Sequence, residues 1–464
     1  MTEDILYAML KNNVIISQDI CVDFKSEEAF KEGATVKITQ IALQNFRGFE
    51  SFTAAFHGKL TVIVGDNGAG KSSLLDSLSI AAGTFLSGFD GLKANRITTD
   101  DAMNKCYEMG SVVDLQAQYP VVISASGDMG GYELTWTREL NSSTGSTTTA
   151  KAKNLISIAA DYQSRIRAGD KTAILPIISY YGTGRLWAQK KEKKSSEQIE
   201  QFSRLVGYTD CLAAESNDKL MMKWFEKMTI QEYQRKGVLP EFAAVKQAIC
   251  KCYQGITGYS DITVQYNPDT RGLDILFTDT DGTHKRYPMK HLSDGYKNTL
   301  SMIADIAYRM AILNPQLLDD VLNQTPGIIL IDEVDLHLHP VWQQRILKDL
   351  QTIFPAVQFI VSTHAPSVIN SVRMENLLIL SDLEQAHQPV CEVYGSDANS
   401  VLSSVMSANE RPVEIKQLFA AFYQAVDEED FDKAEQIYAK LNAEIGNNDP
   451  ELTGARVTLD LETM

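Results

Sequence analysis

The sequence predicts an α/β protein with a mixed sheet, an inserted helical lobe and a C-terminal helical hairpin. Three observations lead to this prediction. Short apolar runs of strand length alternate with segments of helical periodicity through most of the chain, which indicates a mainly parallel sheet. Residues 188–254 lose the strand signals and take on helical spacing. Beyond residue 408, two helical segments enclose an acidic connection at residues 427–430.

The expected elements follow in chain order. The predicted strands are residues 36–43, 52–56, 60–64, two runs within 112–140, 174–181, a β region at 262–287 with a turn at residues 281–282, 327–331 and 357–362. The predicted helices are residues 72–85, 155–167, 294–313, 340–353, 413–425 and 432–445. We divide the chain into an N-terminal arm (1–34), a first lobe (35–187), a helical insertion (188–255), a second lobe (256–407) and a C-terminal helical segment (408–464).

Composition places the chain among ordinary globular proteins. Its 464 residues are 44% hydrophobic, which is enough to bury a core, and no apolar run approaches the length of a membrane span. The first residues are acidic and do not read as a secretory signal, so we expect a cytoplasmic protein. The six cysteines are scattered, and the close pair Cys250 and Cys252 lacks a second ligand pair for zinc. We therefore expect reduced thiols.

The net charge of −17 means that the surface as a whole repels nucleic acid. A nucleic-acid role would need a local basic patch or a basic partner. Two basic stretches, residues 93–96 and 190–194, are candidates for such a patch, and both also fit a solvated face.

A glycine-rich loop follows the strand at residues 60–64. Residues 65–72 read Gly-Asp-Asn-Gly-Ala-Gly-Lys-Ser, which fits the G-x-x-x-x-G-K-[ST] pattern between a strand and a helix. Backbone N–H groups of such a loop curl around phosphates, and the helix N-terminus adds partial positive charge. We expect Lys71 to reach the β- and γ-phosphates of ATP and Ser72 to bind magnesium. The predicted ATP-binding residues of this loop are Gly65, Asn67, Gly68, Gly70, Lys71, Ser72 and Ser73.

Two acids, Asp332 and Glu333, follow the apolar run at residues 328–331. A buried strand would deliver Asp332 to its carboxyl end beside the phosphate loop, where the carboxylate can hold Mg²⁺ directly or through water. Glu333, one residue further on, is placed to polarise the attacking water. We therefore predict Ser72 and Asp332 as metal ligands and Glu333 as the catalytic base.

Two further elements narrow the class of site. Ser293 and Gly295 open the helix at residues 294–313, where a hydroxyl and a glycine backbone make a second phosphate cradle. The sequence Ser-Thr-His ends the strand at residues 357–362 and leaves His364 available to contact the γ-phosphate.

With these four elements the chain resembles the ABC-type ATPases of the RecF, SMC and OLD group. The specific motifs cover residues 36–85 and 285–370. The resemblance implies that Ser293 and Gly295 contact the γ-phosphate bound to the other subunit and that His364 senses it. The Asn-Phe-Arg-Gly-Phe turn at residues 45–49 is typical of this group and would place Arg47 near the nucleotide; a surface arginine is the alternative.

The chain departs from this group in one motif. Its signature reads Ser-Asp-Gly-Tyr rather than Ser-Gly-Gly-Gln, but the serine and the second glycine that contact phosphate are kept. The glutamine of the usual Q-loop is not fixed by the sequence, and Gln116 and Gln118 are its candidates.

Three segments, residues 180–185, 336–340 and 394–399, are similar to the PtuA family, the ATPases of Septu-type and retron-linked anti-phage systems. This resemblance implies a homodimer or higher oligomer and a partner HNH nuclease, PtuB. A retron reverse transcriptase with its RNA–DNA is a further partner of such systems. We interpret His337 and His339 as part of a dimer-contact loop rather than as metal ligands.

The leading hypothesis is therefore an ATPase subunit that controls a partner nuclease through ATP-dependent dimerisation. The alternative is a RecF- or SMC-like ATPase of DNA repair that grips duplex. A third hypothesis is a nucleotide-bound scaffold with little turnover.

Overall fold

The computed structural model describes residues 35–109, 112–186, 203–213, 218–381, 383, 385–406 and 411–463. At its centre is a six-stranded sheet with the order β15-β14-β3-β13-β12-β8, in which β15 alone runs antiparallel. The strands are β3 (Leu60–Gly65), β8 (Ile177–Tyr181), β12 (Gly327–Ile331), β13 (Val357–Ser362), β14 (Leu377–Leu380) and β15 (Ala386–His387). Every residue of the parallel strands is buried, because other layers cover both faces.

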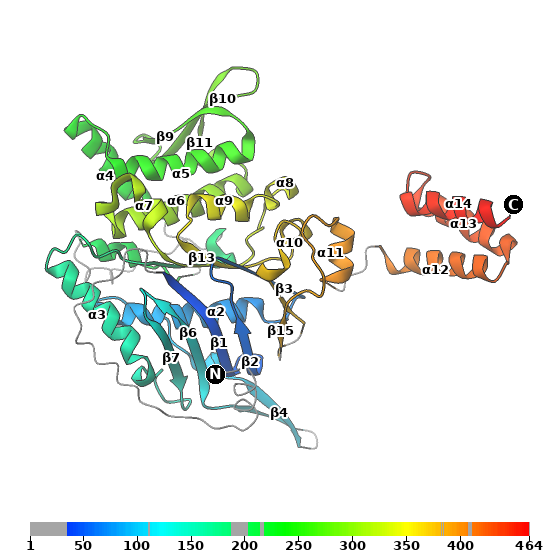
Figure 1. Cartoon of the computed structure of the whole chain (residues 1–464), viewed down its shortest axis with the longest axis horizontal. Coiled ribbons are helices and arrows are strands. Elements are labelled where there is room, and N and C mark those ends of the chain that lie inside the picture. The colour runs from blue at the N-terminus through cyan, green and yellow to red at the C-terminus, as the bar shows by residue number, and fades with distance from the viewer. Residues whose placement is uncertain are drawn as a thin grey trace.

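A second, antiparallel sheet with the order β2-β1-β6-β7 packs against the first. Its strands are β1 (Val36–Phe46), β2 (Phe49–Ala55), β6 (Val121–Met129) and β7 (Glu133–Leu140). The helix α2 (Lys71–Gly83) lies between the two sheets (Figure 1). The indole Nε1 of Trp136 on β7 donates to the Ala81 carbonyl of α2 at 2.9 Å. The helix that follows the predicted phosphate loop is thus fixed between two sheets.

The opposite face of the six-stranded sheet carries a helical layer and a small antiparallel sheet (Figure 1). The longer helices there are α4 (Asp218–Arg235), α5 (Pro240–Thr257), α6 (Asp294–Leu313) and α9 (Ile346–Ile353). The small sheet consists of β9 (Ser260–Asn267), β10 (Gly272–Thr278) and β11 (His284–Pro288). Shorter helices are α7 (Val321–Gln324), α8 (Pro340–Gln343), α10 (Pro366–Ile369) and α11 (Ala398–Ser404), while α3 (Lys153–Arg167) packs beside β7.

Most of the predicted elements are confirmed, and α6 has the predicted bounds. The predicted continuous helix at residues 340–353 is wrong: it is split into α8 and α9. Arg345 leaves regular helix geometry at φ −113°, and its N–H bonds the Trp342 carbonyl three residues back. The predicted N-terminal arm at residues 1–34 and the lysines of residues 190–194 lie outside the described residues.

The sequence did not predict the ribbon that β4 (Asn104–Met109) forms with β5 (Val112–Ala117), although β5 lies within the stretch at 112–140 where strands were expected. It projects from the edge of the molecule (Figure 1). The larger apolar side chains of the ribbon are exposed. The ribbon therefore lacks the alternation of buried apolar and exposed polar residues by which a strand is predicted from sequence.

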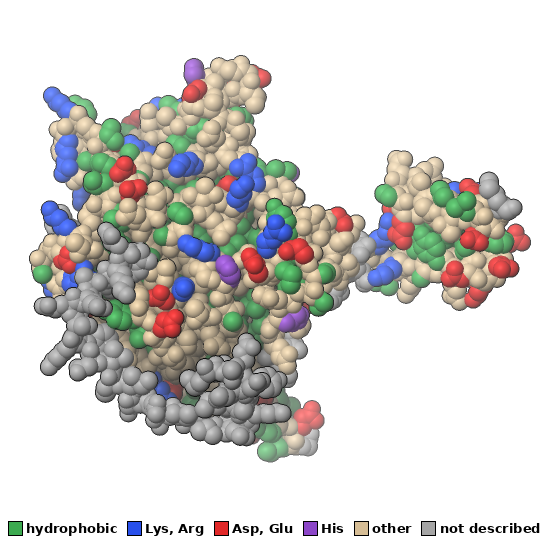
Figure 2. Space-filling model, in the orientation of Figure 1, with side chains coloured by type: hydrophobic (Ala, Val, Ile, Leu, Met, Phe, Trp, Pro, Cys, Tyr) green, Lys and Arg blue, Asp and Glu red, His purple; other side chains and the backbone are tan. Residues whose placement is uncertain are grey.

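The C-terminal helices have a core of their own. They are α12 (Val413–Asp427), α13 (Phe431–Ile445) and α14 (Pro450–Glu462). The predicted hairpin is therefore present as α12 and α13, but α14 adds a third helix. Residues such as Phe419, Phe422, Leu441 and Leu459 form a hydrophobic cluster separate from that of the remaining chain. Several acidic side chains lie on the face of this unit that Figure 2 shows. Among the described residues, no helix is long and apolar enough to cross a membrane.

Candidate functional site

The predicted phosphate loop connects the buried strand β3 to α2. Gly68 and Gly70 adopt positive φ values of 88° and 92°, a backbone region that side chains with a Cβ disfavour. Gly65 is required for a different reason: a Cβ there would lie 2.4 Å from the Leu380 carbonyl oxygen of β14. At three of the predicted positions, the backbone conformation or the neighbouring atoms therefore require glycine. Asn67 and Ser72 are exposed at the loop and the helix start, and Ser73 is half-buried.

Lys71 is the buried cation of this loop, with 7% of its surface exposed. Its Nζ donates to the carbonyl oxygens of Gly65 at 2.7 Å and Asp66 at 2.8 Å. Burial lowers the pKa of Lys71, and this effect is opposed by the charges of Asp332, Asp66 and Glu333. The predicted acidic pair therefore lies within electrostatic range of the phosphate loop, as the sequence suggested.

Asp332 directly follows the central strand β12 and is 4% exposed. Its backbone N–H donates to the Tyr181 carbonyl at 2.8 Å, and its Oδ1 accepts a 2.5 Å hydrogen bond from Ser362 Oγ. The same Ser362 Oγ accepts a hydrogen bond from the Glu333 N–H at 2.8 Å. Ser362 at the end of β13 thus holds both acids of the pair.

Glu333 has a left-handed backbone with φ 48°. For a residue with a Cβ, such a conformation costs on the order of 1–3 kcal/mol and persists where the surroundings enforce it. Here the Ser362 hydroxyl fixes the N–H of Glu333, and the Ser362 carbonyl accepts from the Val334 N–H at 2.9 Å. The left-handed turn at Glu333 therefore comes immediately after Asp332 and is held by Ser362 through both its hydroxyl and its carbonyl.

His364 lies within electrostatic range of Lys71 and Glu333. Its pKa is lowered by burial and, next, by the positive charge of Lys71, while Asp335, Glu333 and Asp66 act in the opposite direction. Its neighbour Thr363 donates to Asp335 Oδ1 at 2.5 Å and accepts from the Ala365 N–H at 3.0 Å. The backbone on both sides of His364 is therefore anchored, and the lowered pKa favours a neutral imidazole at neutral pH.

Ser293 is the exposed N-cap residue of α6, and its side chain does not cap the helix. Gly295 is buried against the following loop: a Cβ there would lie 2.4 Å from the His337 carbonyl oxygen. Tyr296, which stands where the usual signature has glutamine, packs edge-on against Trp342 with ring centroids 4.1 Å apart. The helix start and the loop after the acidic pair are thus packed together as one surface.

The two phosphate cradles lie on opposite faces of the sheet. Neighbouring residues of a strand point to opposite faces, and at the end of β8 the Tyr180 hydroxyl bonds Asp76 of α2 whereas the Tyr181 hydroxyl bonds Asp305 of α6. The helices α2 and α6 therefore cover different faces (Figure 1). Such an arrangement suits a shared site in which each copy supplies one cradle.

Arg47 does not point freely into solvent. Its Nε donates to Asp101 at 2.9 Å and its Nη1 to Asp76 of α2 at 2.5 Å, while its backbone is left-handed at φ 52°. Burial lowers its pKa, but hydrogen bonds and charge from Asp76 and Asp101 raise it overall. Arg47 is held against the helix of the phosphate loop, and its contact with nucleotide stays a prediction.

The remaining residues that the sequence analysis considered lie in different environments. Gln116 is exposed on β5 and its amide donates to Asp114, while Gln118 is half-buried just after β5 and its amide donates to the Gln116 carbonyl. His339 caps α8 by accepting from the Val341 N–H. Cys250 and Cys252 are both free thiols on α5. Within the described part of the chain, no group of three His, Cys, Asp or Glu side chains is arranged to hold a metal ion.

Sequence reasoning missed the residues that support the site rather than form it. Ser362 entered the sequence analysis only as the first residue of the Ser-Thr-His segment, because its contact with Asp332 depends on β13 lying beside β12. Asp76 and Asp101 lie in no motif, and Tyr180 was noted only as part of the segment at residues 180–185. The contacts of these residues depend on how the strands and helices pack.

A phosphate loop after β3, an acidic pair after β12 in the same sheet and an exposed serine at a helix start on the opposite face together define a P-loop ATPase head of the ABC type.

Comparison with known proteins agrees with this class. A family model described as an AAA domain matches residues 40–257, and another, described as "AAA domain, putative AbiEii toxin, Type IV TA system", matches residues 213–370. The chain is 25% identical to the Retron Ec83 probable ATPase of Escherichia coli, over 94% of this chain and 90% of that protein. It is 27% identical to the Retron Vc95 probable ATPase of Vibrio cholerae serotype O1 biovar El Tor, over 82% and 80%. It is 26% identical to the Septu protein PtuA of Bacillus thuringiensis, over 49% and 59%. The chain is an ATPase related to these retron and Septu proteins.

The contacts of Ser362 lead to a first prediction. Replacing Ser362 with alanine removes the donor to Asp332 and the acceptor of the Glu333 N–H. Losing a hydrogen-bond partner of a metal ligand typically weakens metal binding by roughly 10- to 100-fold. We expect the magnesium concentration for half-maximal ATP turnover to rise by that order. Ser164→Ala on α3 is the matched control, and an unchanged magnesium requirement in Ser362→Ala would contradict this role.

Gly295 allows a second prediction. In Gly295→Ala the new Cβ meets the His337 carbonyl, so the start of α6 must shift. Because a misplacement of about 1 Å in a catalytic assembly can cost on the order of 10²-fold in rate, we expect turnover to fall by that order while ATP binding to the phosphate loop is kept. Steady-state hydrolysis and equilibrium nucleotide binding measure the two effects. Gly454→Ala on α14, where a Cβ meets no atom within 4 Å, should change neither.

Proposed function

We propose that this chain is the ATP-binding and hydrolysing subunit of an anti-phage defence complex, and that ATP-dependent dimerisation controls a partner HNH nuclease. The observation that carries the ATP chemistry is the shared support of Asp332 and Glu333 by Ser362, within electrostatic range of Lys71. The defence role is supported by the retron and Septu relatives. A cytoplasmic location accords with this role.

The proposed roles follow from the geometry of the site. Lys71 exchanges the Gly65 and Asp66 carbonyls for the β- and γ-phosphates, which bind a cation more strongly than carbonyl oxygens do. Ser72 and Asp332 offer a hydroxyl and a carboxylate, the oxygen ligands that suit Mg²⁺. When bound, Mg²⁺ neutralises the charge on the phosphates. Glu333 orients and deprotonates the attacking water, and His364 contacts the γ-phosphate.

A second copy completes the site in this proposal. Ser293 is exposed at the start of α6, and α6 lies on the face opposite α2. A head-to-tail pair of chains would therefore bring the Ser293 and Gly295 cradle of one copy to the ATP held by the other. Closure would be transmitted to the helical insertion and to the C-terminal helices, where a partner nuclease could respond; a retron reverse transcriptase with its RNA–DNA is a further partner to test.

The decisive experiment uses the purified full-length chain. We expect it to hydrolyse ATP, to leave DNA and RNA uncut, and to shift from monomer to dimer in analytical ultracentrifugation when ATP is added. Adding the HNH protein encoded beside it should produce ATP-responsive cleavage. Cleavage by the isolated chain that persists in Lys71→Ala would contradict the division of labour between ATPase and nuclease.

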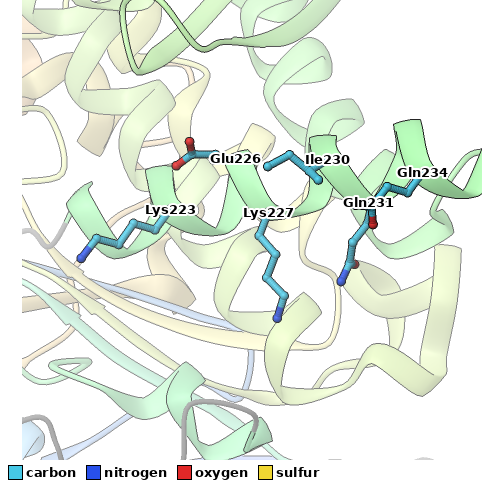
Figure 3. A pocket seen from close by; sticks show the side chains of 6 residues that line it. All are labelled: Lys223, Glu226, Lys227, Ile230, Gln231 and Gln234. Carbon is cyan, nitrogen blue, oxygen red and sulfur yellow. The ribbon is translucent and has the colours of Figure 1, made fainter.

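One observation favours the second candidate, a DNA-gripping ATPase of the repair type. On α4, successive turns carry Lys219, Lys223 and Lys227, a basic stripe in a chain of net charge −17. A shallow hollow on this helix is lined by Lys223, Glu226, Lys227, Ile230, Gln231 and Gln234 (Figure 3). This function predicts salt-dependent binding of duplex by the isolated chain, weakened when the three lysines are replaced by glutamine. Binding that is absent at low salt would exclude it.

A further inference from the structure

A buried ion pair and a tyrosine connect α6 to the strand beside Asp332. Asp305 Oδ2 accepts hydrogen bonds from the Tyr181 hydroxyl at 2.8 Å and from Arg309 Nε at 2.7 Å. Tyr181 and Arg309 are 9% and 5% exposed. The cluster therefore lies inside the protein, between the end of β8 and the middle of the helix that Ser293 begins.

Arg309 ties this cluster to a further segment. Its Nη1 donates to the carbonyl oxygens of Gly207 and Thr209, both at 2.9 Å, at the turn η6 (Arg204–Tyr208). Burial alone would lower the pKa of Arg309, but the Asp305 carboxylate raises it above its ordinary value. Removing one partner of such a buried, hydrogen-bonded pair is strongly unfavourable. Asp305 and Arg309 thus hold α6 in one position, and the hydrogen bond from the Tyr181 hydroxyl links α6 to β8.

Tyr181 also contacts Asp332 through its backbone. Its carbonyl oxygen accepts from the Asp332 N–H at 2.8 Å, directly after the paired residues Tyr181 and Ile331 of the parallel strands. Burial and the neighbouring Asp305 raise the pKa of Tyr181 well above its ordinary value, so its hydroxyl keeps the proton that it donates. A movement of α6 therefore reaches the backbone of Asp332 through one residue.

We propose that Tyr181 is a positioning residue that couples the location of α6 to the magnesium-binding carboxylate of Asp332. This coupling rests on the proposed function. A second copy that engages Ser293 shifts the first residues of α6, and the Asp305–Tyr181 hydrogen bond transmits this shift to Asp332. Metal affinity in this site thereby depends on whether the dimer is closed.

The test removes the hydroxyl and keeps the ring. In Tyr181→Phe, the protein saturated with the non-hydrolysable analogue AMP-PNP is titrated with Mn²⁺, whose binding is followed by electron paramagnetic resonance. Because the hydroxyl bonds Asp305 and acts on Asp332 only through the Tyr181 backbone, we expect a smaller effect than the loss of a direct partner, a fall in Mn²⁺ affinity of roughly three- to tenfold. Affinity for AMP-PNP without metal should stay within about twofold, since the phosphate loop is untouched.

Tyr208→Phe is the matched control, because the Tyr208 hydroxyl is also buried and donates to the Pro176 carbonyl at 2.6 Å. It should lower thermal stability as much as Tyr181→Phe does without changing Mn²⁺ affinity. Equal Mn²⁺ affinity in the two variants would overturn the positioning role. A failure of the proposed dimer would give a different result. The wild-type chain would stay monomeric with AMP-PNP, while Tyr181→Phe would still weaken Mn²⁺ binding. That result would support the positioning role of Tyr181 and contradict the shared site.

Discussion

Replacing Lys71 with alanine is expected to abolish ATP binding at any ordinary concentration of nucleotide. The Lys71 ammonium is the buried cation of the phosphate loop and already holds the Gly65 and Asp66 carbonyls in a curled conformation. Its charge-assisted hydrogen bonds to two phosphates would be lost together, which weakens binding by at least roughly two orders of magnitude. Equilibrium dialysis or fluorescence with a labelled ATP analogue measures this loss.

Lys151→Ala serves as the control for Lys71→Ala. Lys151 is an exposed lysine that pairs with Glu139 away from the loop, so its loss should leave nucleotide binding unchanged. Circular dichroism should show that both variants remain folded. If Lys71→Ala binds ATP as tightly as Lys151→Ala, the loop does not hold the nucleotide.

Glu333→Gln is expected to retain ATP and to stop hydrolysis. Glutamine has the shape of glutamate, and the bond from the residue 333 N–H to Ser362 uses the backbone, so the turn should be preserved. The change removes the carboxylate that deprotonates water, and loss of a general base typically costs about 10²- to 10⁴-fold in rate. Phosphate release under saturating ATP measures turnover, and ultracentrifugation should show a dimer that persists because ATP is not consumed.

The same variant separates an active ATPase from a nucleotide-bound scaffold. Glu435→Gln, on the surface of α13, is the control for loss of a carboxylate elsewhere and should behave as the wild type. If wild-type turnover is already as slow as that of Glu333→Gln, hydrolysis is not what the site does, and the scaffold hypothesis is favoured.

The sequence predicted those elements that are determined by residues close together in the chain. Lys71, the loop glycines and the acidic pair lie in short motifs flanked by apolar runs, and both the runs and the glycine conformations have causes within a few residues. The bounds of α6 were predictable because Ser293 marks the residue before its start and a long apolar stripe marks its length. The break at Arg345 was not, since the helical periodicity continues across it.

The parts that the sequence could not predict depend on strand order. Ser362 supports Asp332 only because β13 lies between β3 and β12 in the sheet, and no spacing along the chain encodes that adjacency. The same holds for Tyr180 and Tyr181, whose hydroxyls reach helices on opposite faces. The ribbon of β4 and β5 escaped prediction because its apolar residues face solvent on both sides.

The separate hydrophobic cluster of α12, α13 and α14 has a consequence for how such proteins can diversify. Since these helices bury their apolar residues against one another, substitutions within them need not disturb the packing around the nucleotide. Recombination at the short connection before α12 could exchange the whole unit without altering the hydrolytic centre. The C-terminal unit can therefore vary in sequence while the phosphate loop and the acidic pair stay unchanged.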